Sequence, residues 1–319
     1  MNIHHLVLSN RSIVVIQPTD SRNFGDHIQF LDTLNALAHY GRLTFNRKSA
    51  KADIAFIIGH TFGYGVDLWN TVKIAKKVSR RVVLLPSSMA LYRFDAISKR
   101  IDKALSEIEL VFVRGIYSYQ LIRELYPHVQ PYVSCDQVLN YFAKKMEEYG
   151  IANVENEKCD VVGVPRYDYA LIYPRKSIIE RVCEIVKKSS RIILVSETDY
   201  KIAEFFSKNV LKLSVKNIYD GNRILNILRN ILNSVSLVIT MRFHFGIVSA
   251  VLNVPTVFVN PIYEYKALDV LGRDNIKCLI DIHYSIDKAE PKPCTFSNSF
   301  ISQNIARYKR MLDMIGELL

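Results

Sequence analysis

Short apolar runs alternate with amphipathic stretches along the whole chain. This pattern is typical of parallel strands joined by crossover helices, because strands buried on both faces need no alternation of polar and apolar side chains. The runs of the first half predict strands at Ser12–Pro18, Asp53–Gly59, Arg81–Ser87 and Glu109–Gly115. Those of the second half predict strands at Asp160–Val164, Arg191–Glu197, Ser236–Thr240 and Pro255–Asn260. Helical patterns separate them, in the second half at Ile178–Lys188, Asn222–Leu232 and Phe243–Leu252.

The repeated scheme predicts an α/β protein of two domains, since 319 residues are too many for one average core. Lys144–Asp160 is polar, charged and short of apolar pairs, which is typical of a linker. We therefore expect Rossmann-like domains at 1–150 and 151–299, with parallel sheets facing across a cleft, and a terminal helix at 300–319. In such sheets ligands bind beyond the carboxyl ends of the strands. Polar residues that directly follow a strand are the first candidates for a site.

The composition is that of an ordinary globular protein, with 49% hydrophobic and 23% charged residues. A net charge of +11 favours an anionic partner, which leaves nucleic acid, an anionic membrane face and a phosphorylated small molecule open. The five cysteines are widely spaced, with no C-x-x-C pair and no histidine at zinc-ligand spacing. The sequence thus predicts neither a disulfide framework nor a structural metal, and it favours a reducing cytosol.

The N-terminal stretch has no basic start, long apolar core or small-residue cleavage site. No run approaches the ~20 apolar residues that span a bilayer. These observations predict a cytoplasmic protein. The basic "RYKR" of the terminal helix favours a solvated helix face and leaves a peripheral contact with the inner face of the membrane open.

One junction combines the end of a predicted strand with an arginine and a histidine. Arg242 follows the strand Ser236–Thr240, and His244 lies in the first turn of the next predicted helix. Unpaired N–H groups and the helix dipole make such a turn an anion site, and a guanidinium adds a fork that fits phosphate or carboxylate. A histidine there exchanges protons near neutral pH. The alternative is structural, with Arg242 paired to a surface carboxylate and His244 satisfied in the core.

Two further segments follow strands of the first half. Arg114 ends the strand Glu109–Gly115, where it predicts either a ligand contact or an interdomain salt bridge. Asp26 opens a helical pattern after the first strand, and it serves either as a helix cap or as a carboxylate in the cleft. Asn23 has the same two interpretations, and Gly25 permits a tight turn or a close backbone approach.

Three more candidates have strong structural alternatives. His60 follows a buried strand in a loop that lacks both G-x-G-x-x-G spacing and a Walker lysine, so it predicts an acceptor contact or a helix cap rather than a nucleotide loop. Asp136 lies near a strand end. Lys266 follows the last clear strand, within reach of the Arg242 turn, and an exposed helical lysine is its alternative.

Taken in order, the pieces that carry these residues are N-F-G-D-H, G-H-T-F-G, L-L-P-S-S, V-F-V-R-G-x-x-S, C-D-Q, T-M-R-F-H-F-G-I-V-S-A-V-L-N-V-P-T-V and Y-E-Y-K. Their order and spacing, from about Asn23 to Leu271, resemble the polysaccharide pyruvyltransferase family. The most specific piece is the R-x-H turn with its small-residue helix. The resemblance implies two Rossmann-like domains of the GT-B type, similar to some bacterial sialyltransferases. It also implies an enzyme without a required metal or cofactor.

The implied reaction moves a pyruvyl unit from phosphoenolpyruvate onto two hydroxyls of a sugar, which gives a cyclic pyruvate ketal. The acceptor is a bacterial surface polysaccharide or its precursor, as a free glycan or a lipid-linked oligosaccharide. Carried over residue by residue, the family's donor-binding arginine falls on Arg114, the R-x-H pair on Arg242 and His244, and the lysine on Lys266. We expect these cations to bind phosphoenolpyruvate, which carries nearly three negative charges.

The chain departs from the family pattern in two places. Family members commonly show a glycine run after the second predicted strand, and this chain has Gly59–Thr61 there instead. The resemblance therefore says less about how this chain binds its acceptor. The spacing from Pro255 to Lys266 is longer than in the usual family pattern. Of the four residues carried over, Lys266 therefore matches the pattern least closely.

For the chemistry we expect His244 to be the acid and Asp26 the base. The expected acceptor contacts are Asn23, His60 and Asp136.

Two other functions compete with this hypothesis. A GT-B glycosyltransferase that uses a nucleotide sugar, such as a CMP-sugar, would hold the donor phosphate with Arg242 and His244. A nucleic-acid-binding protein would account for the positive charge and the 18 tyrosines. The second is disfavoured because the basic residues are scattered and the one patch with interleaved aromatics is short.

Overall fold

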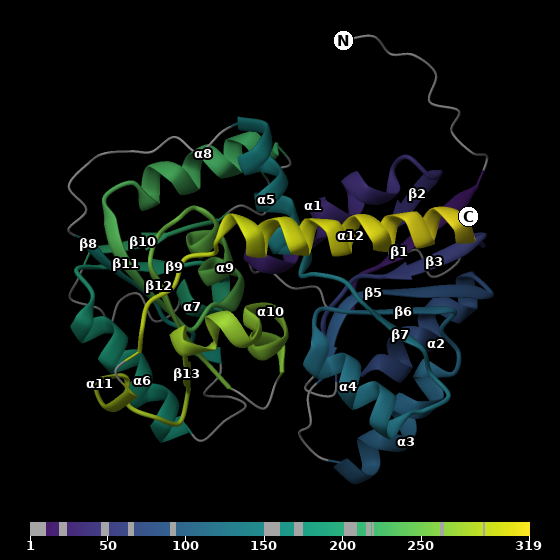
Figure 1. The fold of residues 1–319 in the computed structure, drawn as a ribbon, viewed down its shortest axis with the longest axis horizontal. Coiled ribbons are helices and arrows are strands. Elements are labelled where there is room, and N and C mark those ends of the chain that lie inside the picture. The colour runs from purple at the N-terminus through teal and green to yellow at the C-terminus, as the bar shows by residue number, and fades with distance from the viewer. Residues whose placement is uncertain are drawn as a thin grey trace.

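The computed structural model describes residues 11–18, 24–45, 51–62, 67–89, 94–149, 160–168, 175–200, 209–214, 218, 220–261, 265–289 and 291–319. These residues form two parallel sheets with helices packed on their faces (Figure 1). The predicted fold class, an α/β chain with two Rossmann-like domains, is therefore confirmed. The predicted boundary at residues 150 and 151 lies outside the described residues.

The first sheet has the order β2-β1-β3-β5-β6-β7, with β4 paired to β5, and all its pairings are parallel. Its strands are β1 (Ser12–Ile16), β2 (Arg42–Phe45), β3 (Ile54–Ile57), β4 (Thr61–Phe62), β5 (Arg81–Met89), β6 (Leu110–Val113) and β7 (Pro131–Val133). The helices of this half are α1 (Phe24–Leu37), α2 (Leu68–Val78), α3 (Phe94–Leu105), α4 (Ile116–Leu125) and α5 (Gln137–Tyr149).

The second sheet has the order β10-β9-β8-β11-β12-β13 and is also parallel throughout. Its strands are β8 (Asp160–Val164), β9 (Arg191–Leu194), β10 (Asn209–Lys212), β11 (Val235–Thr240), β12 (Thr256–Asn260) and β13 (Leu279–Asp281). Its helices are α6 (Arg175–Lys188), α7 (Glu197–Tyr200), α8 (Gly221–Leu232), α9 (Phe243–Val251), α10 (Lys266–Asn275), the short 3₁₀ turn η4 (Ile276–Cys278) and α11 (Ile286–Ala289).

The final helix, α12 (Asn298–Leu318), runs from the second half across to the first (Figure 1). Its buried face carries Tyr308, Met311 and Ile315, which pack with Ile13 and Phe56 of the first sheet. The basic residues of "RYKR" lie on its exposed face, whereas the tyrosine between them is buried. The helix therefore contributes to the core of the first half although its sequence follows the second.

The predicted linker Lys144–Asp160 is partly wrong. Residues 144–149 form the last turns of α5 rather than a connection. The reason is that Phe142 and Met146, one helical turn apart, face the core that α5 shares with α8 and α9. Glu147 and Glu148, two of the charged residues that make the segment look like a linker, are exposed on this helix.

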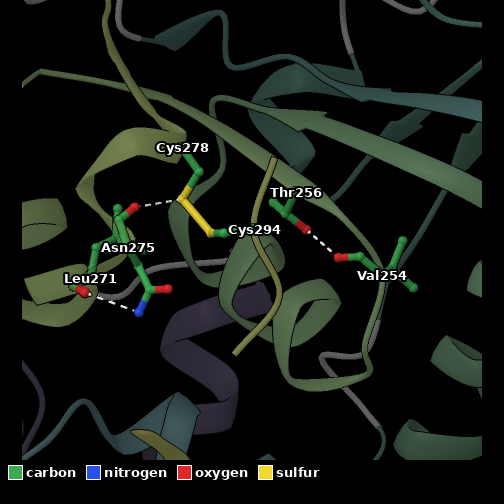
Figure 2. Close-up of a disulfide and its surroundings, with 6 residues drawn as sticks. All are labelled: Val254, Thr256, Leu271, Asn275, Cys278 and Cys294. Carbon is green, nitrogen blue, oxygen red and sulfur yellow. Dashed lines mark hydrogen bonds between the residues drawn. A yellow bond between two sulfur atoms is a disulfide. The ribbon is translucent and has the colours of Figure 1, made fainter. Parts of the chain in front are cut away.

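The prediction of no disulfide is also wrong, because Cys278 and Cys294 are joined by one (Figure 2). Cys278 directly precedes β13, which pairs with β12, and Cys294 forms an antiparallel bridge with Thr256 at the start of β12. Two neighbours of β12 thus bring together cysteines 16 residues apart in sequence. Sequence spacing does not reveal this meeting because it depends on strand order.

Two tyrosines tether α12 and offer a matched test of stability. The Tyr308 hydroxyl donates to buried Asp32, whose pKa burial raises to about 6, and the Tyr40 hydroxyl donates to the Leu312 carbonyl at 2.9 Å. At pH 7 we expect Tyr308→Phe to lower the free energy of unfolding by about 1.5–3 kcal/mol, because a buried carboxylate loses a donor. Tyr40→Phe, which removes a half-buried neutral bond, should cost about 0.5–1.5 kcal/mol. Urea denaturation measures both losses. Equal losses for the two variants would contradict the assignment of Asp32 as an ionised, buried partner of Tyr308.

Candidate active site

The candidate residues gather where the carboxyl ends of the two sheets meet. Arg114 follows β6 and Asp136 follows β7, whereas His244 follows β11 and Lys266 follows β12. Parallel strands place all their carboxyl ends at one edge of a sheet, which is why residues so distant in sequence can converge. The two edges touch through α5 with α9, α1 with α9, and α10 with α4.

Asp136 is the centre of this meeting. Its Oδ2 lies 2.9 Å from Arg114 Nε of the same half and 3.7 Å from His244 Nε2 of the other half. Asp136 and Arg114 are each 1% exposed, and His244 is 8% exposed. The ion pair with Arg114 is therefore buried, while the distance to His244 is too long for a hydrogen bond.

The electrostatics of the cluster follow from its burial. Burial alone would raise the pKa of Asp136, but the charge of Arg114 holds it well below its ordinary value. Burial and the neighbouring charge of Lys266 lower the pKa of His244 to about 4, although Asp136 opposes the shift. At neutral pH the resting site therefore combines an ionised Asp136 with an uncharged imidazole.

Beside this ion pair, two buried side-chain nitrogens at this centre make no hydrogen bond within the part of the chain that the structure describes. They are Arg114 Nη1 and His244 Nε2. Buried polar groups are nearly always hydrogen-bonded, so orphaned ones on facing elements indicate a place where a ligand completes the set. His244 also lies in the first turn of α9, whose N-cap makes no side-chain hydrogen bond. The N-terminal turn of a helix favours an anion.

Lys266 opens α10 directly after Tyr265, which has a left-handed backbone with φ of 49°. Its Nζ lies 5.3 Å from the centroid of the Phe243 ring, in cation–π contact at the start of α9. Burial and the charge of Arg114 lower the pKa of Lys266 to about 7, against the opposing charges of Asp136 and Asp26. The predicted reach of this lysine toward the R-x-H turn is present, and the lysine titrates near neutral pH.

Asp26 and His60 lie at the same edge of the first sheet. Asp26 is buried in the first turn of α1, and its charge acts on both His60 and Lys266. His60 Nδ1 lies 3.1 Å from the Thr61 carbonyl oxygen, and burial lowers the pKa of its ring. His60 precedes the short strand β4, so it caps no helix. Asn23 lies outside the described residues.

Arg242 engages different partners from its neighbour His244. Its Nε donates to Asp199 Oδ2 at 2.7 Å and its Nη2 to Asp168 Oδ1 at 3.0 Å. Arg166 grips the same Asp168 through two bonds of 2.9 and 3.1 Å. Arg242 is thus paired with carboxylates, as its structural interpretation predicted. One of them, Asp199, is buried and not at the surface.

The sequence interpretation did not single out Arg166, Asp168 or Asp199 as site residues. Arg166 and Asp168 lie in the loop that follows β8, and Asp199 lies in α7, the short helix after β9, so a search a few residues beyond each strand end could have found them. The charge of Arg166 also acts on Lys266, which indicates that this second cluster adjoins the first. Four strand ends of the second sheet, those of β8, β9, β11 and β12, therefore contribute to one charged region.

Gly25 makes room for the His244 ring. A Cβ atom built on Gly25 would lie 1.7 Å from His244 Nδ1, so the predicted close approach is met by a histidine. We expect Gly25→Ala to displace the ring and to reduce turnover by about 10²-fold, because general acid–base help needs exact placement of the donor. Gly316→Ala in α12 is the control, since its Cβ would meet nothing closer than 3.5 Å. Normal turnover of Gly25→Ala in a steady-state assay would contradict this role for the glycine.

A model of the polysaccharide pyruvyl transferase family matches residues 9–262, which span most of the strand ends just described. The chain belongs to this family. The resemblance found in the sequence is thereby confirmed, and pyruvyl transfer to a polysaccharide is the activity that membership supports. None of the curated proteins matches the chain.

Solved structures resemble the chain in fold. A functionally uncharacterized protein from Klebsiella pneumoniae subsp. pneumoniae NTUH-K2044 has a TM-score of 0.52 and 16% identity, over 85% of this chain and 93% of that one. An α-glucosyltransferase in complex with UDP gives 0.39 and 10%, over 95% and 91%. The wall teichoic acid polymerase TagF gives 0.38 and 10%, over 98% and 88%. The first of these supports the two-sheet fold of this family member.

Metal and membrane features are not found in the described ranges. No group of three or more His, Cys, Asp and Glu side chains among those residues is arranged to hold a metal ion. No helix within them has the length and apolar character to cross a bilayer. The described residues instead offer the buried Arg114–Asp136 ion pair, with the His244 imidazole and the Lys266 ammonium beside it at the N-terminus of α9.

Proposed function

We propose that the protein transfers a pyruvyl group from phosphoenolpyruvate to a sugar of a surface polysaccharide or its precursor, as a cyclic ketal. The observation that carries the proposal is the cluster of buried Arg114, Asp136 and His244 with half-buried Lys266, drawn from both halves, in which Arg114 Nη1 and His244 Nε2 make no hydrogen bond to any described residue. A small polyanion fits this arrangement. No metal or other cofactor is part of the proposed reaction.

Arg114 and Lys266 are the proposed direct contacts to phosphoenolpyruvate. Arg114 offers Nη1, which makes no hydrogen bond to the described part of the chain, and Lys266 adds a compact charge beside the N-terminus of α9. The guanidinium of Arg242 is already bonded to Asp199 and Asp168, so its proposed contribution is to hold the R-x-H turn and to add charge behind it. Asp136 keeps Arg114 in place rather than binding the acceptor directly.

His244 is the proposed acid, and substrate binding raises the pKa of its ring so that it takes up a proton from water. Because the pKa of His244 is lowered to about 4, the ring is neutral at pH 7. A trianion held within a few ångströms favours the imidazolium and raises that pKa. The imidazole would therefore be protonated, and able to act as an acid, only when phosphoenolpyruvate is bound.

The protons of the reaction balance without a further reactant. His244 delivers a proton to C3, an acceptor hydroxyl attacks C2, and the C2–O–phosphate bond breaks as phosphate leaves. The second hydroxyl then closes the ketal at C2. The two hydroxyls release two protons, of which one remains on the new methyl group and the other leaves with hydrogen phosphate. Asp26, buried at the start of α1, is the proposed base for the attacking hydroxyl.

The acceptor is proposed to approach from the first sheet. Asn23 and His60 are its proposed contacts, because His60 lies at the same edge as Asp26. A cytoplasmic glycan or a lipid-linked oligosaccharide at the inner face of the membrane would both present the required pair of hydroxyls. The sugar itself is an outcome of the experiment below.

The proposal is tested by incubating the protein with phosphoenolpyruvate and a panel of glycans. We expect release of inorganic phosphate together with an acceptor whose mass grows by one pyruvate less one water. A parallel arm replaces phosphoenolpyruvate with nucleotide sugars, including CMP-sugars. Nucleotide release with glycosylated product, and no phosphoenolpyruvate turnover, would overturn the proposal in favour of a glycosyltransferase.

The pH dependence gives a separate prediction for Lys266. Because its pKa is lowered to about 7, the ammonium is lost as pH rises through that value, and binding of the trianion should weaken. We expect kcat/KM for phosphoenolpyruvate to fall as pH increases above about 7. In Lys266→Arg, whose side chain stays charged, this basic limb should disappear even if the maximum is lower. Initial rates from about pH 6 to about pH 9 measure both profiles, and identical basic limbs would exclude the lysine.

A further inference from the structure

Helix α4 begins without a cap of its own. Gly115 occupies its N-cap position and makes no side-chain hydrogen bond. The first N–H groups of any helix need partners from outside it, and a side chain at the N-cap ordinarily supplies one. Here the partner comes from helix α10 of the other half: the Ser118 N–H donates to Asp269 Oδ1 at 2.9 Å.

The contact is bidentate and buried. The Ser118 hydroxyl donates to Asp269 Oδ2 at 2.5 Å and accepts a bond of 2.8 Å from the Met89 N–H at the end of β5. Both side chains are buried. Burial raises the pKa of Asp269 to about 6, which still leaves the carboxyl ionised at neutral pH, where it complements the positive end of the α4 dipole.

Gly115 is required by space and not by backbone conformation. Its φ of −164° is ordinary extended backbone that any residue adopts. A Cβ atom there would lie 2.3 Å from the Asp269 carbonyl oxygen and 2.6 Å from its Cα. The backbone of α10 therefore rests directly on the N-cap of α4, with no gap in which a side chain could fit.

This contact joins the two elements that carry the cations of the site. Arg114 directly precedes Gly115, and Lys266 lies one helical turn before Asp269 in α10. Building on the proposed function, we infer that Asp269 is a positioning residue: it caps α4 from the opposite domain and so sets the spacing of Lys266 and Arg114 around phosphoenolpyruvate.

Two variants break the contact by independent routes. Asp269→Ala removes the cap, and Gly115→Ala forces α10 away while leaving Asp269 intact. We expect each to raise KM for phosphoenolpyruvate about tenfold with a smaller change in kcat, because hydrogen bonds to a buried carboxylate are lost and the cations separate. Asp269→Asn retains an acceptor for the Ser118 N–H and should recover most of the loss. Asp274→Ala, at an exposed position of α10 beyond the kink at Gly272, is the control.

Amide hydrogen exchange gives a readout that does not depend on activity. In the wild type the Ser118 amide should be protected, and both variants should speed its exchange at least about tenfold. Wild-type exchange at Ser118 in Asp269→Ala, or an unchanged KM in a variant whose exchange is faster, would overturn the proposal. If Asp269→Ala does not fold, the same two measurements on Gly115→Ala decide. The wild type is assayed first. If it does not turn over phosphoenolpyruvate, the proposed function is overturned, and not the role of Asp269.

Discussion

His244→Ala is expected to reduce turnover by at least ~10²–10⁴ while the protein remains folded. The imidazole faces Asp136 from the other half of the molecule, and its Nε2 makes no hydrogen bond to a described residue. Without it, protonation at C3 depends on water, which the buried setting disfavours. Steady-state rates of phosphate release measure the loss.

Two controls separate chemistry from packing for this variant. His244→Gln keeps most of the volume and one hydrogen-bond donor but cannot act as an acid at neutral pH, so it should be nearly as inactive. Binding of phosphoenolpyruvate, followed by calorimetry, should weaken far less than turnover. Near-normal turnover in either variant would exclude His244 as the acid.

Arg114→Met should abolish measurable binding of phosphoenolpyruvate and also lower the free energy of unfolding by about 3 kcal/mol. The first effect follows from the loss of the proposed guanidinium contact. The second follows from burial, because Asp136 is left as a charge 1% exposed without its close partner. The urea midpoint and a calorimetric titration measure the two effects separately.

The double variant Arg114→Met/Asp136→Asn tells these effects apart. The asparagine removes the buried charge and keeps an acceptor for the Val138 N–H, which Asp136 Oδ1 accepts at 2.9 Å. The free energy of unfolding should largely recover, because no unpaired buried charge remains, whereas binding of phosphoenolpyruvate should stay lost. If binding returned together with stability, Arg114 would be a structural residue only.

The prediction of strands succeeded for the interior of each sheet and failed at the edges. All eight predicted strands are observed, and they are the interior strands of the two sheets. The strands that the pattern missed include the four edge strands β2, β7, β10 and β13. Interior strands are covered on both faces and need continuous apolar runs, whereas β2 and β10 are largely half-buried or exposed along their length. Nothing in their residues alone distinguishes such strands from loops.

The candidate site shows a similar division. Strand ends marked Arg114, Asp136, Arg242, His244 and Lys266 in advance, because a parallel sheet exposes those positions whatever the rest of the fold does. That the charge of Asp26 acts on Lys266 of the other half, rather than Asp26 only opening a helix, depends on how the two halves pack together. The preference of Arg242 for Asp199 and Asp168 depends on the order in which β8, β9 and β11 lie.

Periodicity and strand-end chemistry therefore carry the two-sheet architecture, the family and the position of the cationic cluster, since each depends on residues near one another in sequence. The pairing of Cys278 with Cys294, the cap that Asp269 provides for α4 and the protonation of His244 and Lys266 arise otherwise. Each requires groups from distant segments to be buried against one another. Distance and desolvation set those properties, and both exist only once the two halves have packed together.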